Sequence, residues 1–269
     1  MITGHDNPRI KLLKSLLTTQ GRKKNSSFII EGFKLFHEAL NSGSHIEYFF
    51  YSPSALESRE GMFLKDIIEE KAINSCLISN SIMNSLCDTV SPQGLIAVIK
   101  KEIAYTEEID FSDHIWLVAY EIQDPGNLGT IIRTADAAGV KGIFLSAGTV
   151  DVTNPKVIRA TMGSFFHIDL FKIKDIEAFI LNSRKKGVTF ITTSVSSGRE
   201  YYSIKYRTPA VLIVGNEGHG LPEDIIRQSD ITVTIPVYGK AESLNVGIAS
   251  AIILYEMARQ KTLYENREG

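Results

Sequence analysis

Residues 211–221 have the sequence VLIVGNEGHGL, in which four branched apolar residues lead directly into a glycine-rich turn. An uninterrupted apolar run of this length is typical of a strand buried on both faces of a parallel sheet. The glycines at positions 215, 218 and 220 allow a tight turn whose backbone can approach a ligand closely. The stretch therefore predicts a buried strand that ends in a functional loop.

Neither common nucleotide-binding motif fits this turn. A P-loop has the pattern GxxxxGK[ST], because its lysine must reach the phosphates, and GNEGHGL contains no lysine. A dinucleotide fingerprint has the order GxGxxG, whereas the order here is GxxGxG, late in the chain. A purely structural turn, followed by a helix that starts at Leu221-Pro222, remains an alternative.

Similar apolar runs alternate with helix-like segments on both sides of this stretch. Strands are predicted at 116–120, 142–146, 189–194, 210–215 and 231–236, and helices at 127–139, 155–163, 175–187, 221–228 and 243–260. This alternation predicts an α/β fold with a mostly parallel sheet. The earlier part is mixed, with helical spacing at 10–17 and 34–40 and strand-like runs at 46–52 and 94–100. We predict an N-terminal domain over 1–100, a charged linker over 101–113 and a second domain over 114–269.

The composition is that of a globular protein. Of 269 residues, 43% are hydrophobic and 22% are charged, and the two cysteines match no zinc or redox motif. No apolar run approaches the roughly 20 residues that a membrane crossing needs. We therefore expect a soluble cytoplasmic protein without a metal.

Positive charge gathers near the N-terminus. Between residues 1 and 27, Asp6 is the only acid, and the six cations are Arg9, Lys11, Lys14, Arg22, Lys23 and Lys24. Such a cluster can lie along nucleic-acid phosphates, and a solvated basic helix is the alternative.

Two further stretches carry polar groups beside turns. In IQDPGNLGTIIRTADAAG, residues 122–139, Asn127 can cap a helix that presents Arg133, and this helix start suits an anion. A surface pair between Arg133 and Asp136 is the alternative. In TIPVYGKAESLNVGIASAIILYE, residues 234–256, Ser243 can cap a helix that is apolar on nearly every side and is predicted to be buried. Its small residues allow close helix packing, either in a dimer or within one chain.

Together, DPGNLGTIIRTADAAG, VLIVGNEGHGL and IPVYGKAESLNVGIASAIILYE resemble the three signature motifs of the SpoU (TrmH-type) RNA 2′-O-ribose methyltransferases of the SPOUT superfamily, in the family's order. Residues 150–166 are similar to the segment after the first motif. FIIEGFKLFHEAL and SPQGLIAVIK resemble the family's N-terminal RNA substrate-binding domain. The resemblance implies a deep trefoil knot in the C-terminal part of the sheet, S-adenosylmethionine as cofactor and a homodimer.

The resemblance also assigns site residues. The catalytic positions are Asn127, Arg133, Glu217, Ser243 and Asn245. The cofactor positions are Thr193, Ser194, Gly215, Asn216, Glu217, Gly218, Ile235, Pro236, Ser243, Leu244 and Asn245. Arg133 and Arg159 join the N-terminal cations as RNA contacts. Val237 and Gly247 depart from the family pattern, which affects local packing. His219 is assigned to packing of the turn in preference to a role as base.

The implied reaction is methylation of a ribose 2′-hydroxyl, with 23S rRNA favoured over tRNA. Arginine keeps its proton at ordinary pH, so we expect Arg133 to bind an RNA phosphate and stabilise the developing alkoxide, while Asn245 or Ser243 orients the nucleophile. Two alternatives from other classes are a non-catalytic RNA-binding relative and a nucleotide-dependent oxidoreductase.

Overall fold

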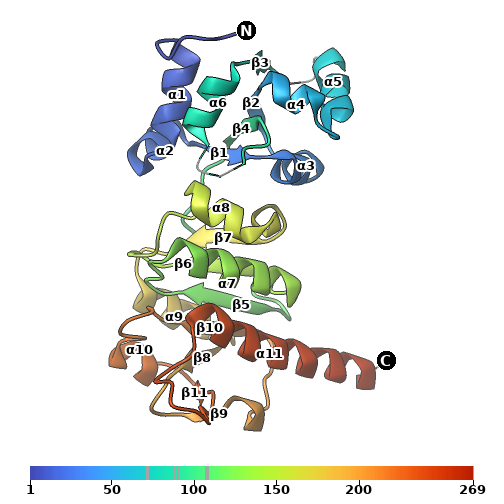
Figure 1. The fold of residues 1–269 in the computed structure, drawn as a ribbon. Coiled ribbons are helices and arrows are strands. Elements are labelled where there is room, and N and C mark those ends of the chain that lie inside the picture. Colours follow the sequence, from blue (N-terminus) through green and yellow to red (C-terminus); the bar gives the residue numbers. More distant parts are fainter. Residues whose placement is uncertain (71–72, 88, 90, 107–108, 269) are drawn as a thin grey trace. The chain divides into compact units, whose positions relative to one another are not determined.

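The computed structural model describes residues 1–70, 73–87, 89, 91–106 and 109–268 (Figure 1). Residues 107 and 108 of the predicted linker therefore lie outside the described residues. The chain forms two compact units, one of Met1–Glu102 with Thr153–Phe166 and the other of Ile103–Val152 with His167–Gly269. The predicted domain boundaries at 100 and 114 stay a prediction.

The second unit contains a seven-stranded sheet in the order β7-β6-β5-β10-β8-β11-β9, and every neighbouring pair is parallel. The strands are β5 (Ile115–Ala119), β6 (Gly142–Leu145), β7 (Asp169–Lys172), β8 (Thr189–Thr193), β9 (Arg199–Glu200), β10 (Ala210–Val214) and β11 (Ile231–Thr234). All five residues of β10 are buried, as its apolar sequence predicts. The predicted α/β class is confirmed, and the knot stays a prediction.

Helices cover this sheet. They are α7 (Pro125–Ala137), α9 (Ile176–Arg184), α10 (Glu223–Arg227) and α11 (Val246–Glu268), with a 3₁₀ turn η2 at Tyr201–Ser203. Residues of α9 and α10 join the buried cluster formed by β5, β6, β8 and β10. The helices α7 and α11 pack side by side (Figure 1).

Within one chain α11 is not buried all round, so packing inside the chain alone does not account for its apolar sequence. Ser250, Ile253 and Leu254 are at most 1% exposed, whereas Ile248 is 50% and Tyr255 is 54% exposed. Residues seven apart on a helix share a face, so α11 has one buried face and one exposed apolar face.

The first unit contains a four-stranded sheet in the order β1-β4-β2-β3. Its strands are β1 (Ser27–Glu31), β2 (Ile46–Tyr51), β3 (Ser75–Leu77) and β4 (Leu95–Lys100). Its helices are α1 (Pro8–Leu16), α2 (Thr19–Asn25), α3 (Phe33–Asn41), α4 (Pro53–Glu57), α5 (Gly61–Glu70), α6 (Asn80–Leu86) and α8 (Pro155–Thr161), and η1 spans Ser164–Phe166. The helix α8 packs on β1 although it follows β6 in the sequence. In the described part of the chain, no helix is both long and apolar enough to cross a membrane.

Candidate active site

The predicted site residues gather at one edge of the parallel sheet. The strands β5, β10, β8 and β11 are consecutive neighbours, so their carboxyl ends lie along the same edge. The loops that follow them contain the three motif stretches. In open α/β sheets this edge is where ligands bind.

A chain of hydrogen bonds joins the three motif stretches. The amide nitrogen of Asn127 donates to Glu217 Oε1 at 3.1 Å, and the Asn245 amide nitrogen donates to Asn127 Oδ1 at 2.8 Å. Glu217 comes from the glycine-rich turn, Asn127 from α7 and Asn245 from the start of α11. The three side chains therefore hold loops that are about a hundred residues apart in the sequence.

The carboxylate of Glu217 also accepts the backbone N–H groups of Gln123 at 3.2 Å and Asp124 at 3.1 Å. Partial burial by itself raises the pKa of this carboxyl. The hydrogen bonds from Asn127 and from the backbone amides outweigh burial, so the pKa of Glu217 lies below its ordinary value. Glu217 is therefore charged at neutral pH.

Two predicted helix caps are wrong. The N-cap of α7 is Asp124, whose side chain accepts from the Asn127 N–H at 2.8 Å, so Asn127 lies inside the first turn. The start of α11 is capped by Asn245 instead of Ser243, because Asn245 Oδ1 accepts from Gly247 N at 2.9 Å and Ile248 N at 3.3 Å. Carboxylates of Asp124 and Glu217 therefore occupy the start of α7, where a substrate anion was predicted.

The glycine-rich turn is closed by its own backbone. Asn216 and Gly220 exchange two hydrogen bonds of 3.1 and 2.9 Å. A Cβ atom on Gly215 would lie 2.5 Å from the carbonyl carbon of Gly220, and Gly220 has a φ of +69°. Gly215 therefore has no side chain because the backbone of Gly220 lies against it. Contact between Gly215 and a ligand stays a prediction.

Side chains of the turn point in different directions. The Asn216 amide nitrogen donates to the carbonyl of Glu121 at 2.8 Å, and its Oδ1 accepts from the backbone of Gly218 and His219. The imidazole of His219 is exposed. Glu121 has an unusual φ of +51°, and nothing in the sequence marks it as part of the site.

The loop between β11 and α11 is open. Within the described chain, no hydrogen bond is formed by the backbone of residues 236–244. Val237 is 39% exposed, Leu244 is 38% exposed and Tyr238 is 89% exposed. The loop thus presents bare amide and carbonyl groups beside apolar side chains. This combination suits a ligand with a flat ring and several polar groups.

The end of β8 contributes hydroxyl groups to the same edge. Ser194 Oγ lies 2.9 Å from Ser197 Oγ, and the Ser194 N–H donates to the carbonyl of Val233 at 3.0 Å. The neighbouring Thr192 is fully buried and lies 2.8 Å from the hydroxyl of Ser229. This buried contact ties β8 to the end of α10, and sequence reasoning missed it because isolated hydroxyl residues give no pattern.

Arg133 stands apart from this network. Its side chain is exposed, and no described residue forms a hydrogen bond or ion pair with it. It lies six residues after Asn127, about 9 Å along α7. The alternative pairing with Asp136 is not formed in the described structure, and Asp136 contacts His167 at 3.1 Å instead. Arg133 therefore presents a free guanidinium to solvent.

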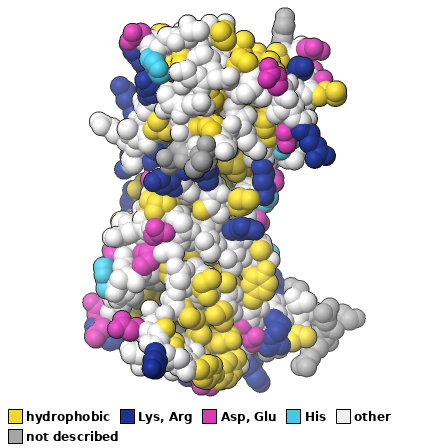
Figure 2. All heavy atoms as spheres, in the orientation of Figure 1, with side chains coloured by type: hydrophobic (Ala, Val, Ile, Leu, Met, Phe, Trp, Pro, Cys, Tyr) yellow, Lys and Arg dark blue, Asp and Glu magenta, His cyan; other side chains and the backbone are white. Residues whose placement is uncertain are grey.

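The predicted RNA contacts of the first unit have different surroundings. Arg22 is only 3% exposed, and its guanidinium donates to the carbonyls of Leu16 and Leu17. Arg159 is partly buried and pairs with Glu31 at 3.6 Å. The exposed cations are Arg9, Lys11, Lys14, Lys23 and Lys24, and Figure 2 shows Lys and Arg side chains on the surface over α1 and α2. Arg22 is therefore an internal helix-packing residue, which corrects its prediction as a phosphate contact.

Family models match both parts of the chain. Residues 114–255 match the model of the SpoU rRNA Methylase family, and residues 7–97 match the MRM3-like substrate binding domain.

Individual relatives are similar over nearly the whole chain. The 23S rRNA (guanosine(2553)-2′-O)-methyltransferase RlmP of Bacillus subtilis is 34% identical over 93% of this chain and 96% of its own. A 23S rRNA (uridine(2479)-2′-O)-methyltransferase of Streptomyces viridochromogenes is 24% identical over 95% and 91%. The AdoMet-bound rRNA methyltransferase of Sinorhizobium meliloti superposes with a TM-score of 0.86 at 32% identity, covering 96% of this chain and 97% of that one.

Proposed function

Because the chain belongs to the SpoU rRNA methylase family, we propose that it transfers a methyl group from S-adenosylmethionine to a ribose 2′-hydroxyl of RNA, with 23S rRNA as the favoured substrate. The observation that carries this proposal is the Glu217–Asn127–Asn245 chain, which holds the three motif loops together. One relative is named as a guanosine methyltransferase and another as a uridine methyltransferase. The target nucleotide therefore has to be identified by experiment.

The open edge of the sheet fits the cofactor. Bare backbone groups of residues 236–244 and the exposed side chain of Leu244 can receive an adenine ring and its polar atoms. The remaining positions assigned to cofactor binding are Thr193, Ser194, Gly215, Asn216, Gly218, Ile235 and Pro236. When bound, S-adenosylmethionine would supply an activated methyl group and a neutral thioether leaving group.

Arg133 is assigned to the negatively charged groups of the RNA substrate. Its free guanidinium can bind an RNA phosphate with two parallel hydrogen bonds and stabilise negative charge on the ribose oxygen. Glu217 is a poor proton acceptor, because hydrogen bonds from the protein already use both of its carboxylate oxygens. We therefore assign the proton of the ribose hydroxyl to solvent water.

The polar motif residues divide into two groups. Glu217, Asn127 and Asn245 position the loops, since each already has hydrogen-bond partners within the protein. Ser243 is exposed and has no such partner among the described residues. We therefore assign Ser243, in preference to Asn245, to orienting the ribose hydroxyl.

Assembly and location follow from the same proposal. The exposed apolar face of α11, with Ile248 and Tyr255, supports a homodimer. The exposed lysines near the N-terminus support RNA binding by the first unit. A cytoplasmic location agrees with an rRNA substrate.

The decisive experiment maps ribose methylation. RNA from cells with and without this protein is compared, and the purified protein is tested on rRNA with labelled cofactor. We expect loss of one 2′-O-methyl group in 23S rRNA and its restoration in vitro. If a 2′-O-methyl group is lost from tRNA instead, the substrate is tRNA. If 2′-O-methylation changes in no RNA, the protein is better explained as a non-catalytic RNA-binding relative.

A further inference from the structure

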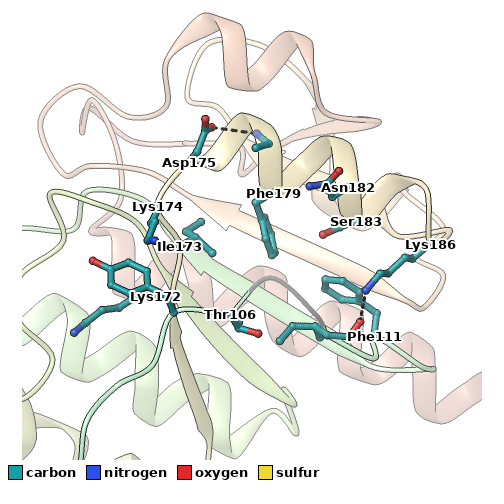
Figure 3. Close-up of a pocket in the computed structure, with 13 residues that line it drawn as sticks. Thr106, Phe111, Lys172, Ile173, Lys174, Asp175, Phe179, Asn182, Ser183 and Lys186 are labelled. Atoms are coloured by element: carbon teal, nitrogen blue, oxygen red, sulfur yellow. Dashed lines mark hydrogen bonds between the residues drawn. The ribbon is translucent and has the colours of Figure 1, made fainter.

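A cavity of about 270 Å³ lies beside the edge strand β7, away from the active-site loops (Figure 3). Its walls are α9, the end of β7 and four described residues of the segment that precedes β5, namely Tyr105, Thr106, Ile109 and Phe111. That segment runs along the free edge of β7, because the Lys172 N–H donates to the Ala104 carbonyl at 2.9 Å and the Thr106 N–H donates to the Lys172 carbonyl at 3.3 Å. The cavity is therefore part of the second unit alone.

The floor of this cavity is apolar and fixed. Phe111 and Ile173 line it and are each 4% exposed. Phe179 extends from α9 into the cavity (Figure 3). Phe111 and Ile173 belong to a buried cluster of the sheet and Phe179 packs against it, so these side chains cannot easily move to fill the space. A fixed aromatic floor suits a flat ring.

Among the described lining residues, positive charges outnumber negative ones. Lys172, Lys174 and Lys186 line the cavity, and Asp175 is the one acid among the described lining residues. Asp175 caps α9, since its Oδ1 accepts from the backbone N–H groups of Glu177 and Ala178. Lys186 donates to the carbonyl of Ile109 at 3.0 Å. Lys172 and Lys174 therefore remain for an anion.

Tyr105 places an aromatic ring beside these two lysines. The ring is 58% exposed, and the ammonium groups of Lys172 and Lys174 lie 5.8 and 5.2 Å from its centroid. Exposed aromatic rings flanked by cations are how proteins hold single-stranded nucleic acid, with bases stacked on rings and phosphates on lysines. The volume of the cavity is near the lower limit for small-ligand sites, so it suits one nucleotide better than a larger ligand.

We propose that this cavity binds one unpaired nucleotide of the RNA substrate, with its base against Tyr105 and Phe179 and its phosphate at Lys172 and Lys174. The proposal rests on the proposed function. In the sheet order, β7 is two strands from β5 and three from β10. At the usual strand spacing these separations are about 10 and 14 Å. The carboxyl ends of these parallel strands share one edge, so an RNA strand at the active-site loops can continue to the cavity.

The test measures binding of short single-stranded oligoribonucleotides by fluorescence anisotropy, with cofactor affinity measured separately by calorimetry. We expect Tyr105→Ala to weaken RNA binding about tenfold, because loss of one stacked base has roughly that effect. Lys174→Gln should also weaken RNA binding, because it removes a phosphate contact. Tyr105→Phe should bind like the parent protein. Lys185→Gln is the matched control, since Lys185 is an exposed lysine at the opposite end of α9 from Lys174 and does not line the cavity. Cofactor affinity should be the same in all five proteins.

Equal RNA affinity of the parent, Tyr105→Ala and Lys174→Gln proteins would overturn the proposal. A second result would also overturn it. If the protein binds free uridine monophosphate and Tyr105→Ala abolishes this binding without changing RNA affinity, the cavity binds a free nucleotide instead of RNA. Failure of the proposed function has a different signature. In that case the parent protein would methylate no RNA, whatever the cavity variants bind.

Discussion

At the scale of single residues, the site separates groups that hold loops from groups that are free to meet substrate. Glu217, Asn127 and Asn245 are joined to one another by hydrogen bonds, whereas Arg133 has no partner among the described residues. Replacing a member of the joined set should disturb the loops and therefore cofactor binding. Replacing Arg133 should affect RNA contact and the reaction but leave cofactor binding unchanged.

Arg133→Ala should lower kcat about 100-fold or more, because it removes a donor aimed at the developing negative charge. Arg133→Lys keeps the charge but loses the planar pair of donors, so it should recover only part of the rate. Calorimetric affinity for S-adenosylmethionine should stay unchanged in both variants. Normal turnover of Arg133→Ala at saturating cofactor would exclude this arginine from the chemistry.

Glu217→Gln should weaken cofactor binding about tenfold, because an amide cannot accept all the hydrogen bonds that the carboxylate receives. The pH dependence has a defined sign. Since the folded-state pKa of Glu217 lies below its ordinary value of 4.5, the charged group stabilises the fold above that pH. This contribution disappears as pH falls through the lower folded-state pKa.

Urea unfolding of the parent protein and of Glu217→Gln should therefore differ at pH 6 and converge in acid. A difference in unfolding free energy that grows as the pH is lowered would contradict this assignment.

At the scale of elements, neighbouring cations of α2 have opposite roles. Arg22 points inward and closes the junction between α1 and α2, while Lys23 and Lys24 are exposed. Arg22→Ala leaves the carbonyls of Leu16 and Leu17 without these donors and should lower the free energy of unfolding by about 1–3 kcal/mol. Chemical denaturation measures this change.

The matched control is the double variant Lys23→Ala, Lys24→Ala. Its stability should stay within about 0.5 kcal/mol of the parent, because both side chains are exposed. If both lysines contact phosphates, the slope of log K against log salt for single-stranded RNA should shrink by about 1.4. An unchanged slope would remove α2 from the RNA surface.

At the scale of the whole molecule, we expect two copies of the chain to associate through the exposed apolar face of α11. Ile248→Asp places a charge on this face and should convert a dimer to a monomer in analytical ultracentrifugation. Leu181→Asp is the control, because Leu181 is 58% exposed on α9, away from this face. A parent protein that sediments as a monomer would refute the dimer directly.

The sequence predicted the central strands β5 and β10 well, because both are fully buried and their apolar runs are continuous. It missed β7, which lies at the sheet edge and begins and ends with a charged residue. It grouped the polar motif residues only through family resemblance. It could not distinguish Asp124 from Asn127 as a cap, since both types cap helices and the backbone path decides between them. Nor could it separate buried Arg22 from the lysines beside it.

The grouping of Thr153–Phe166 with the first unit means that the polypeptide passes between the units three times. Val157 and Ile158 of this excursion are fully buried against the first unit. A fragment that stops at Glu102 would expose the surface they cover and should be prone to aggregate. Excision of either half as a continuous gene fragment is therefore a poor strategy. Joining residues 1–102 to 153–166 by a short artificial linker should give the smallest soluble version of that unit.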